Sequence, residues 1–246
     1  MRPLNIPVVL GTSRKGRMSA HAARFIVDLL NQRAGVTSTL VDVSQVPLPV
    51  DDAGEAIKDG MFAATIAAAD ALVIVAPEYN HSFPGLLKHA LDSCLNEYIH
   101  KAVGLVGVSS GPFAGIRVVQ SLLPVMRELG LVTIFWDINF GTIGKVFDES
   151  GRLLDEAFVR RSDKFVRELI WMAKVLRYGR EQVTIDEEAA VQCEMCGAMM
   201  NHHGDKPMMA DTPDDAPSPM ASMHACPACG NQTAVIGAPQ PVGEPA

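Results

Sequence analysis

Up to about residue 178, short apolar runs alternate with longer segments whose apolar residues recur every three to four positions. The short runs are almost continuously apolar and rich in Val and Ile, which is typical of strands buried on both faces of a parallel sheet. The longer segments have the spacing of amphipathic helices. The predicted strands are Ile6–Thr12, Thr39–Val43, Ala71–Tyr79, Ala102–Ser110 and Leu131–Asn139, and the predicted helices are 19–33, 54–69, 84–96, 115–129 and 156–177.

This alternation of strand and helix predicts a doubly wound α/β fold. Five strands with five helices fit a flavodoxin-like, five-stranded parallel sheet of order 2-1-3-4-5. In such a sheet, ligands bind beyond the carboxyl ends of the strands, near the point where the strand order reverses. The loops after the first, third and fourth predicted strands are therefore the candidate site.

The composition changes sharply after Tyr178. The segment 179–246 contains no Phe, Trp, Tyr or Leu, yet it holds half of the 16 prolines and most of the 12 methionines. A segment with so few large apolar side chains cannot bury enough surface to offset its chain entropy. We expect it to be disordered unless something other than an apolar core orders it.

The formal net charge of −7 belongs to this C-terminal segment, because only Arg180 and Lys206 of the 21 basic residues lie in it. Neither part of the chain offers the basic surface of a nucleic-acid-binding protein. No apolar run approaches the roughly 18 residues of a membrane helix, and the charged N-terminal region is unlike a signal peptide. We therefore expect a cytoplasmic protein with no nucleic-acid or membrane partner.

The first candidate loop, Gly11–Ser19, joins a predicted strand to a predicted helix. Backbone N–H groups and the helix dipole make such an N-terminus an anion site. The loop lacks the Gly-Lys-Ser/Thr ending of a P-loop and the Gly-x-Gly-x-x-Gly pattern of dinucleotide-binding folds. A phosphomonoester fits it, and the alternative is a solvated basic turn capped by Ser19. The side chains that would donate hydrogen bonds are Thr12, Ser13, Arg14, Arg17 and Ser19.

The second and third loops, Pro77–Gly85 and Ser109–Gly115, contain turn-forming and aromatic residues. Pro84 suits the first turn of a helix, and Ser82 is a candidate cap for it. His81 is either a turn residue or a general acid/base. Glycines in the third loop let backbone approach a flat ligand closely, although an ordinary strand-to-helix turn would have the same composition.

Together, the segments GTSRKGRMS, PEYNHSFPGLLKHALD and SSGPFAGIR resemble the signature segments of the NADPH-dependent FMN reductase family, which includes flavin, quinone, chromate and azo-dye reductases. The stretch FDESGRLLDE at 147–156 also resembles one that precedes the family's last helix. The resemblance spans about residues 5–176. It implies an NAD(P)H-dependent oxidoreductase in which hydride passes from NADPH or NADH to FMN, and electrons then pass to a small-molecule acceptor. The alternative is a flavodoxin-type FMN electron carrier without NAD(P)H turnover.

The resemblance also implies which residues contact FMN and how the chain assembles. The helix 84–96 resembles the family's dimer-forming helix, so a homodimer or homotetramer is implied. Pro112 and Phe113 depart from the family by replacing small residues. No catalytic side chain is required, because the chemistry occurs at the flavin N5 atom. The implied cofactor-binding residues are Thr12, Ser13, Arg14, Arg17 and Ser19 near the phosphate, Pro77, Glu78, Tyr79, Asn80 and Ser82 beside the ring, and Ser109, Ser110, Gly111 and Gly115 over its other side.

Four of the five cysteines form two Cys-x-x-Cys-Gly pairs, at Cys193 and Cys196 and at Cys226 and Cys229. Four thiolates at this spacing suit a tetrahedral metal, either zinc or a single iron, whereas disulfides and free thiols are the alternatives. The pattern resembles rubredoxin, an iron electron carrier, but that domain packs an aromatic core that this segment lacks. We therefore favour a zinc ribbon that folds only with its metal, with a structural role or as a protein-interaction module.

These patterns predict four parts. The first is a flavodoxin-like FMN-binding domain at residues 1–180, followed by a linker at 181–192. A four-cysteine metal ribbon occupies 193–232, with Asn201–Ala225 as a flexible insert. A disordered tail at 233–246 ends the chain.

Overall fold

The computed structural model describes residues 2–48, 60–183, 192–198, 200–207 and 220–236 of the 246-residue chain. They belong to two compact units, Met1–Gln182 and Val183–Ala246. The first unit is built on a parallel sheet with helices on both faces, and the second contains four cysteines and an antiparallel sheet. In the part of the chain that is described, no helix combines the length and apolarity needed to cross a bilayer.

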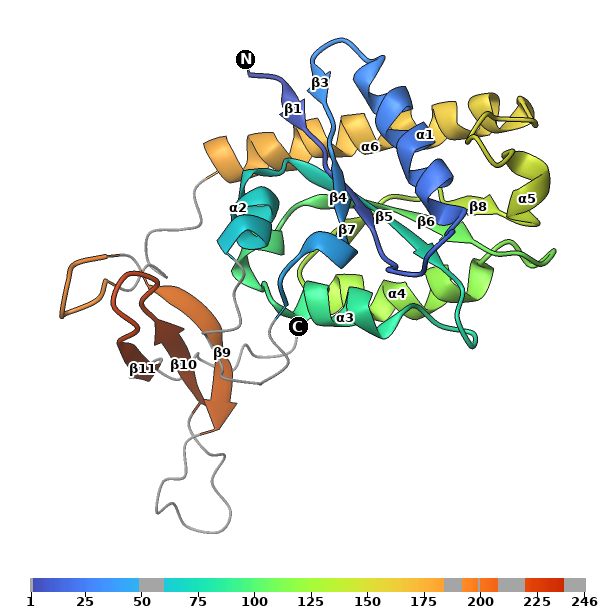
Figure 1. Cartoon of the computed structure of the whole chain (residues 1–246). Helices are drawn as coiled ribbons and strands as arrows, with labels where there is room; N and C mark the ends of the chain where they lie inside the picture. The colour runs from blue at the N-terminus through green and yellow to red at the C-terminus, as the bar shows by residue number, and fades with distance from the viewer. Residues whose placement is uncertain (1, 49–59, 184–191, 199, 208–219, 237–246) are drawn as a thin grey trace, which may run out of the picture. The chain divides into compact units, whose positions relative to one another are not determined.

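The parallel sheet confirms the predicted strand order. Its strands run β4 (Leu40–Asp42), β2 (Val8–Leu10), β5 (Ala71–Pro77), β6 (Ala102–Val108) and β7 (Val132–Thr133), and β8 (Ile138–Phe140) pairs further along β6 (Figure 1). All these pairings are parallel. With β7 and β8 counted as one edge, the order is the flavodoxin-like 2-1-3-4-5.

Two strands differ from the prediction: the first, predicted at Ile6–Thr12, is limited to Val8–Leu10, and the last is interrupted. Pro7, which has no N–H to donate to a ladder, separates β2 from β1 (Leu4–Asn5), which pairs with β3 (Val36–Thr37). The predicted strand Leu131–Asn139 is divided into β7 and β8 by Phe135 and Trp136, whose side chains are exposed. The sequence does not reveal this break, since aromatic residues also favour strands.

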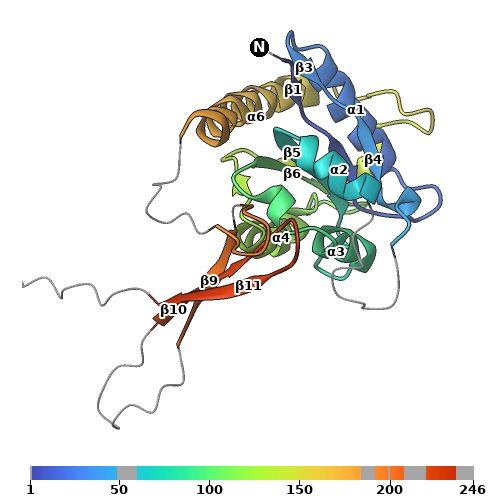
Figure 2. The ribbon, with the colours of Figure 1, turned by 90° about the vertical axis from the view of Figure 1, so that its left-hand side faces the viewer.

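Alternate residues of each central strand enter two separate cores. Ala71, Val73 and Val75 of β5 pack with α1 (Ser19–Asn31) and α6 (Ala157–Gln182). The intervening residues of β5 pack toward the opposite face of the sheet, which is covered by α2 (Gly60–Ala68), α3 (Gly85–Asp92) and α4 (Ile116–Glu128) (Figure 2). This two-residue alternation is how a parallel sheet buries both faces. The described part of this unit also contains three short helices, η1 (Val43–Gln45), η3 (Asn96–Tyr98) and α5 (Ile143–Val146).

Each predicted helix corresponds to one of these helices, with shifted ends. The predicted helix 84–96 ends at Asp92 in α3, and the one predicted at 156–177 continues to Gln182 in α6. Glu181 and Gln182 therefore belong to a helix and not to the predicted linker. Residues 54–59 of the helix predicted at 54–69, and 184–191 of the linker, lie outside the described residues.

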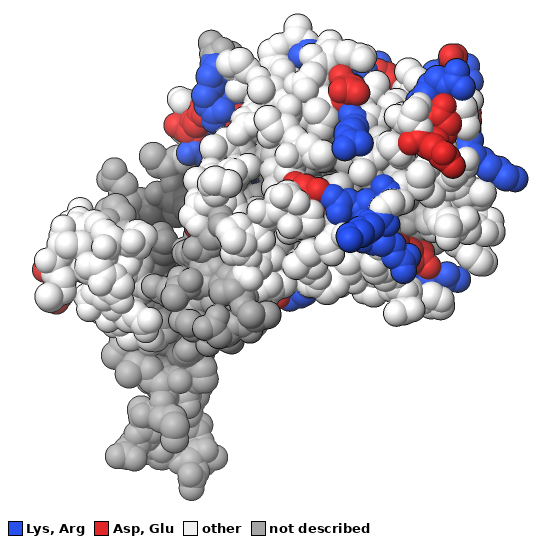
Figure 3. All heavy atoms as spheres, viewed as in Figure 1, with Lys and Arg blue, Asp and Glu red and all other residues white. Residues whose placement is uncertain are grey.

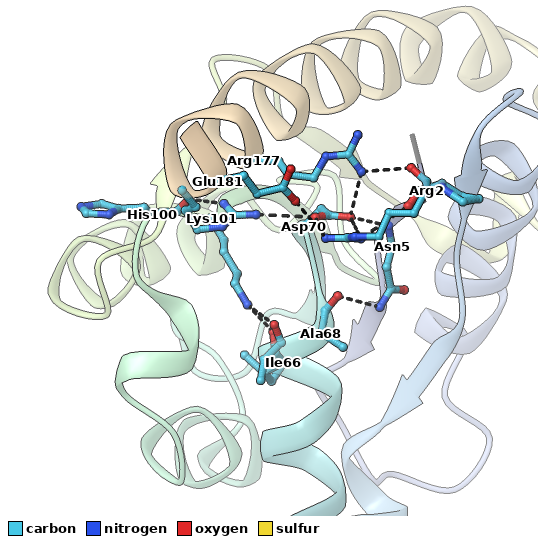
Figure 4. Close-up of polar contacts among 12 residues, drawn as sticks. Arg2, Asn5, Ile66, Ala68, Asp70, His100, Lys101, Arg177 and Glu181 are labelled. Atoms are coloured by element: carbon cyan, nitrogen blue, oxygen red, sulfur yellow. Dashed lines mark hydrogen bonds and ion pairs between the residues drawn. The ribbon is translucent and has the colours of Figure 1, made fainter. Parts of the chain in front are cut away.

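The buried carboxylate of Asp70 connects the last turns of α6 to the amino end of the sheet (Figure 4). Asp70, fully buried before β5, accepts hydrogen bonds from Arg2 at 2.7 and 2.8 Å and from the Asn5 backbone N–H at 2.9 Å. Arg177 and Arg180 of α6 lie 3.7 and 3.6 Å from the same carboxylate. A buried carboxylate needs such partners, since an unpaired one is costly.

The second unit differs from the prediction of a flexible insert. Its strands β9 (Asn201–Pro207), β10 (Met220–Ala225) and β11 (Gln232–Ile236) form an antiparallel sheet of order β11-β10-β9. The ends of the insert are thus strands, because backbone pairing in an antiparallel ladder does not require large side chains. β11 also extends past residue 232 into the predicted disordered tail. Residues 208–219 and 237–246 lie outside the described residues.

Candidate functional site

The loops after β2, β5 and β6 meet around a pocket of about 250 Å³ at the carboxyl ends of these strands. This is the place at which open α/β sheets bind ligands. Eight of the residues singled out from the sequence line it, together with four that were not. The lining residues are Arg14, Gly16, Arg17, Met18, Ser19, Pro77, Glu78, Tyr79, Val108, Ser109, Ser110 and Ile143.

Two buried hydroxyl groups lie at opposite ends of the first loop, Thr12 shortly after β2 and Ser19 at the start of α1. Thr12 Oγ1 lies 3.1 Å from the Tyr79 hydroxyl. Ser19 Oγ is buried and has no hydrogen-bond partner among the described residues. Met18 is the N-cap of α1, so Ser19 is not the cap that the alternative interpretation required. A buried hydroxyl without a partner is unfavourable, and an oxygen of a bound anion would satisfy it.

The two arginines of the first loop are in different electrostatic situations. The Arg14 guanidinium lies over the Tyr79 ring, 5.1 Å from its centre, and makes no ion pair with any described residue. Arg17 instead forms an ion pair with Asp42 at the end of β4 and lies 3.5 Å from the Ser44 hydroxyl. The charge of Arg17 is therefore balanced within the protein, whereas Arg14, of the two arginines that line the pocket, is the one whose charge is available to a ligand.

The loop after β5 is a tight two-residue turn. Tyr79 and Ser82 exchange backbone hydrogen bonds of 2.8 and 2.9 Å. Asn80 and His81 between them have positive φ values of 50° and 66°, as in the primed turns that close hairpins. The turn orients Tyr79, while Asn80, His81 and Ser82 are not among the described residues lining the pocket. Ser82 does not cap α3, whose N-cap is Pro84.

Glu78 forms part of the pocket wall and is nearly buried, with 10% of its side chain exposed. Its backbone N–H donates to the Val108 carbonyl at 2.8 Å, which holds the loop against the end of β6. One carboxylate oxygen accepts a hydrogen bond from Arg117 at 3.0 Å. The other is buried and has no partner in the described part of the chain.

Gly115, which the sequence predicts to approach a ligand, packs closely against β6. A Cβ at this position would lie 2.5 Å from the Val108 backbone nitrogen, and its φ of 72° is left-handed. It therefore allows α4 to start close against the sheet. Among the described residues, the predicted contacts that do not line the pocket are Thr12, Ser13, Asn80, Ser82, Gly111 and Gly115.

The lining residues missed by sequence reasoning are Gly16, Met18, Val108 and Ile143. Gly16 and Met18 lie inside the first loop and could have been included from their position alone. Ile143 comes from α5, a helix of only four residues whose pattern is too short to recognise. It reaches the pocket because its N–H donates to the Ser109 carbonyl at 3.1 Å.

A second pocket, of about 580 Å³, adjoins the first loop. Arg14, Lys15, Arg17 and Arg24 contribute cationic groups to it, whereas Glu149 is its one acid. Lysine and arginine side chains gather on this face of the molecule (Figure 3). Their field favours anionic ligands at the adjoining site.

In the second unit, the four predicted metal ligands lie together. The Sγ atoms of Cys193, Cys196, Cys226 and Cys229 are all within 4.8 Å of one another, and the shortest separations are 3.5, 3.5 and 3.6 Å. Four sulfurs at about 2.3 Å from one tetrahedral metal would be about 3.8 Å apart. The cysteines are not joined as disulfides.

The two cysteine pairs have the same backbone hydrogen bonds. Cys193 N–H donates to Ala198 at 2.8 Å and Gly197 N–H donates back to Cys193 at 2.8 Å. The Cys226 turn repeats both bonds, at 2.8 Å to Asn231 and 2.9 Å from Gly230. Both glycines are left-handed, with φ of 72° and 71°. The two turns thus present their thiols in equivalent ways, as a four-sulfur site requires.

Comparisons with known proteins identify the family and the fold of the first unit. The model of the NADPH-dependent FMN reductase family matches residues 4–141. The FMN-dependent NADPH-azoreductase of Staphylococcus haemolyticus is 29% identical over 180 residues, which cover 66% of this chain and 92% of that protein. A quinone reductase of Pseudomonas putida is 28% identical over 178 residues, covering 66% and 95%. The structure of FerB, an NAD(P)H:(acceptor) oxidoreductase from Paracoccus denitrificans, aligns with a TM-score of 0.60 at 20% identity, covering 70% of this chain and 98% of FerB.

Proposed function

Because this chain belongs to the NADPH-dependent FMN reductase family, we propose that its first unit binds FMN in the three-loop pocket and uses it to oxidise NADPH or NADH. The chain is an oxidoreductase, and what we propose is where it binds its cofactor and which acceptors it reduces. The electrons pass to a small acceptor, such as a quinone, a free flavin, an azo compound or chromate. Azo compounds and quinones are the acceptors that the names of its relatives indicate.

The observation that carries this proposal is that Ser19, at the start of α1, and Arg14, in the loop before it, line the same pocket. A buried hydroxyl without a partner and a cation without an ion pair, both judged over the described residues, stand beside one pocket. A phosphomonoester would satisfy both, with the dipole of α1 adding to the attraction. The donor set therefore fits the phosphate of FMN.

The remaining loops supply the walls for a flat ring. Pro77, Glu78 and Tyr79 would border one edge, and Ser109 with Ser110 would face it from β6. FMN, when bound, would supply the redox chemistry, as the acceptor of hydride from NADPH or NADH and the donor of electrons to the second substrate. The protein would orient the ring through the Tyr79–Ser82 turn and balance the phosphate charge with Arg14.

We also propose how the chain assembles and where it is located. The resemblance of the segment containing α3 to a dimer-forming helix supports a homodimer or homotetramer. A cytoplasmic location stays a prediction from the sequence.

For the second unit, we propose a structural zinc ion bound by the four cysteines. The sulfur separations and the two equivalent turns support a tetrahedral site. Iron is the alternative, and a red protein after removal of flavin would identify it. Metal analysis that finds neither ion at one per chain would contradict the proposal.

The proposed activity is tested by flavin analysis and steady-state kinetics. We expect the purified protein to be yellow, to release FMN on denaturation, and to oxidise NADPH or NADH when a quinone is supplied. A protein that holds FMN but does not turn over either nucleotide would be an electron carrier. A colourless protein that FMN cannot saturate would refute the proposed site.

A further inference from the structure

Phe113 is an exposed aromatic residue in the loop between β6 and α4. Its side chain is 62% exposed, and the neighbouring Ile116 is 51% exposed. It follows Ser110, which lines the three-loop pocket, by a few residues. Isolated exposed apolar residues are common in folded proteins, so the exposure by itself has no functional meaning.

The loop holds Phe113 in a fixed position, however. Ser109 Oγ and the Thr142 N–H both donate to the Gly111 carbonyl, at 2.8 and 2.9 Å. After Phe113, Ala114 has a φ of 57°. A left-handed alanine is unfavourable and persists only where its surroundings enforce it. The backbone is therefore ordered at the position where the aromatic ring meets solvent.

Arg117 connects this ring to the wall of the pocket. Its guanidinium lies 4.5 Å from the centre of the Phe113 ring and donates a hydrogen bond of 3.0 Å to the Glu78 carboxylate. Glu78 lines the pocket and is nearly buried. Because the guanidinium covers part of the ring while most of the side chain is exposed, Phe113 offers a free aromatic surface.

We propose that Phe113 is the platform on which the electron acceptor stacks, and that it selects flat aromatic acceptors over compact inorganic ones. The proposal rests on the proposed function, since it places the platform beside the FMN pocket. A planar ring would stack on the face of Phe113 that the Arg117 guanidinium leaves free. A compact metal complex cannot stack in this way. Glu78 and Arg117 are positioning residues for the ring.

The test compares two acceptors in full-length variants. In Phe113→Leu, we expect the KM for menadione, a flat quinone, to rise roughly 2- to 10-fold, the range expected when an aromatic pair is lost. The KM for ferricyanide and the FMN content should not change. Phe113→Tyr should behave like the wild type because it keeps the ring. Phe135→Leu, which alters another exposed phenylalanine, is the matched control.

A second measurement does not depend on turnover. Saturation-transfer NMR with menadione, the oxidised protein and no nucleotide should give weaker binding for Phe113→Leu by the same factor. Unchanged menadione binding, or equal effects on both acceptors, would overturn the proposal. A change in oligomeric state in Phe113→Leu would also overturn it, because the ring would then belong to a contact between copies. If the wild type binds no FMN, the proposed function fails separately, and the NMR comparison still decides whether Phe113 binds the quinone.

Discussion

At the scale of single residues, the burial of Ser19 makes it a candidate ligand contact. Its hydroxyl is the kind of group that proteins bury only with a partner, and the described chain provides none. The sequence alone left Ser19 as either a helix cap or a phosphate ligand. The position of Met18 at the cap favours the second role.

We therefore predict that Ser19→Ala weakens FMN binding by about 1.5–3 kcal/mol, the usual value of a hydrogen bond to a charged group. The free energy of unfolding of the flavin-free protein should not fall, since the hydroxyl makes no hydrogen bond within the described chain. Titration of the flavin-free protein with FMN, followed by flavin fluorescence, measures this. Ser150→Ala, at an exposed serine outside the pocket, is the control. Equal affinities in Ser19→Ala and wild type would exclude the hydroxyl from the site.

Gly115 leads to a prediction about stability. Gly115→Ala would bring a Cβ within 2.5 Å of the Val108 nitrogen in a left-handed conformation. Strain and overpacking together should lower the free energy of unfolding by about 2–5 kcal/mol. Urea denaturation of flavin-free protein measures the change. Gly144→Ala, whose Cβ would have no described atom within 4 Å, should remain within about 1 kcal/mol of wild type, and a similar loss in both variants would contradict the packing argument.

At the scale of elements, the amino end of the sheet depends on buried charges that the hydrophobic pattern does not reveal. Lys101, just before β6, donates to the Ile66 and Ala67 carbonyls at the end of α2, at 2.6 and 2.7 Å. Burial, assisted by the nearby positive charge of Arg180, lowers the pKa of Lys101 to about 8. The ammonium group thus joins α2 to the sheet, but burial makes its charged form less favourable in the folded protein than in the unfolded chain.

Because the pKa of Lys101 is lower in the folded state, the free energy of unfolding should depend on pH. Below pH 8 both the folded and unfolded states hold the proton, and the folded state bears the penalty. As the pH rises from about 8 toward 10.5, the folded state releases its proton first, so Lys101 makes the free energy of unfolding increase. Lys101→Met should lack this increase, whereas Lys88→Met, at an exposed lysine paired with Asp92, should keep it. Urea denaturation at pH 7.5 and 9.5 compares them, and the same rise in Lys101→Met would contradict the assignment.

At the scale of the whole molecule, the chain divides into two units that are stabilised differently. The first has two extensive apolar cores on either side of its sheet. The buried cluster found in the described part of the second consists of Cys193, Met200 and Cys226. So small a core cannot offset the entropy of ordering the chain, and bound metal would supply the missing free energy.

We therefore predict that a chelator unfolds the second unit and leaves the first intact. In the full-length protein, EDTA should make all four metal-site thiols reactive and abolish hydrogen-exchange protection in β9, β10 and β11. The FMN content and the thermal transition of the first unit should not change. Addition of Zn²⁺ should restore protection. Persistence of the β9–β11 protection in metal-free protein would show that this unit folds without metal.

The sequence by itself determined the features that depend on local spacing. The alternation of apolar runs predicted the sheet order and the three loops of the site, because burial on one or both faces sets the period of apolar residues. Cys193 and Cys226 could be assigned with their partners because Cys-x-x-Cys turns bring two thiols together locally.

Only the tertiary structure decided which loop residues line the pocket. Arg17 is neutralised by Asp42, Gly115 packs on β6, and Ile143 enters from a short helix. These outcomes depend on contacts between segments distant in sequence, which no local period encodes.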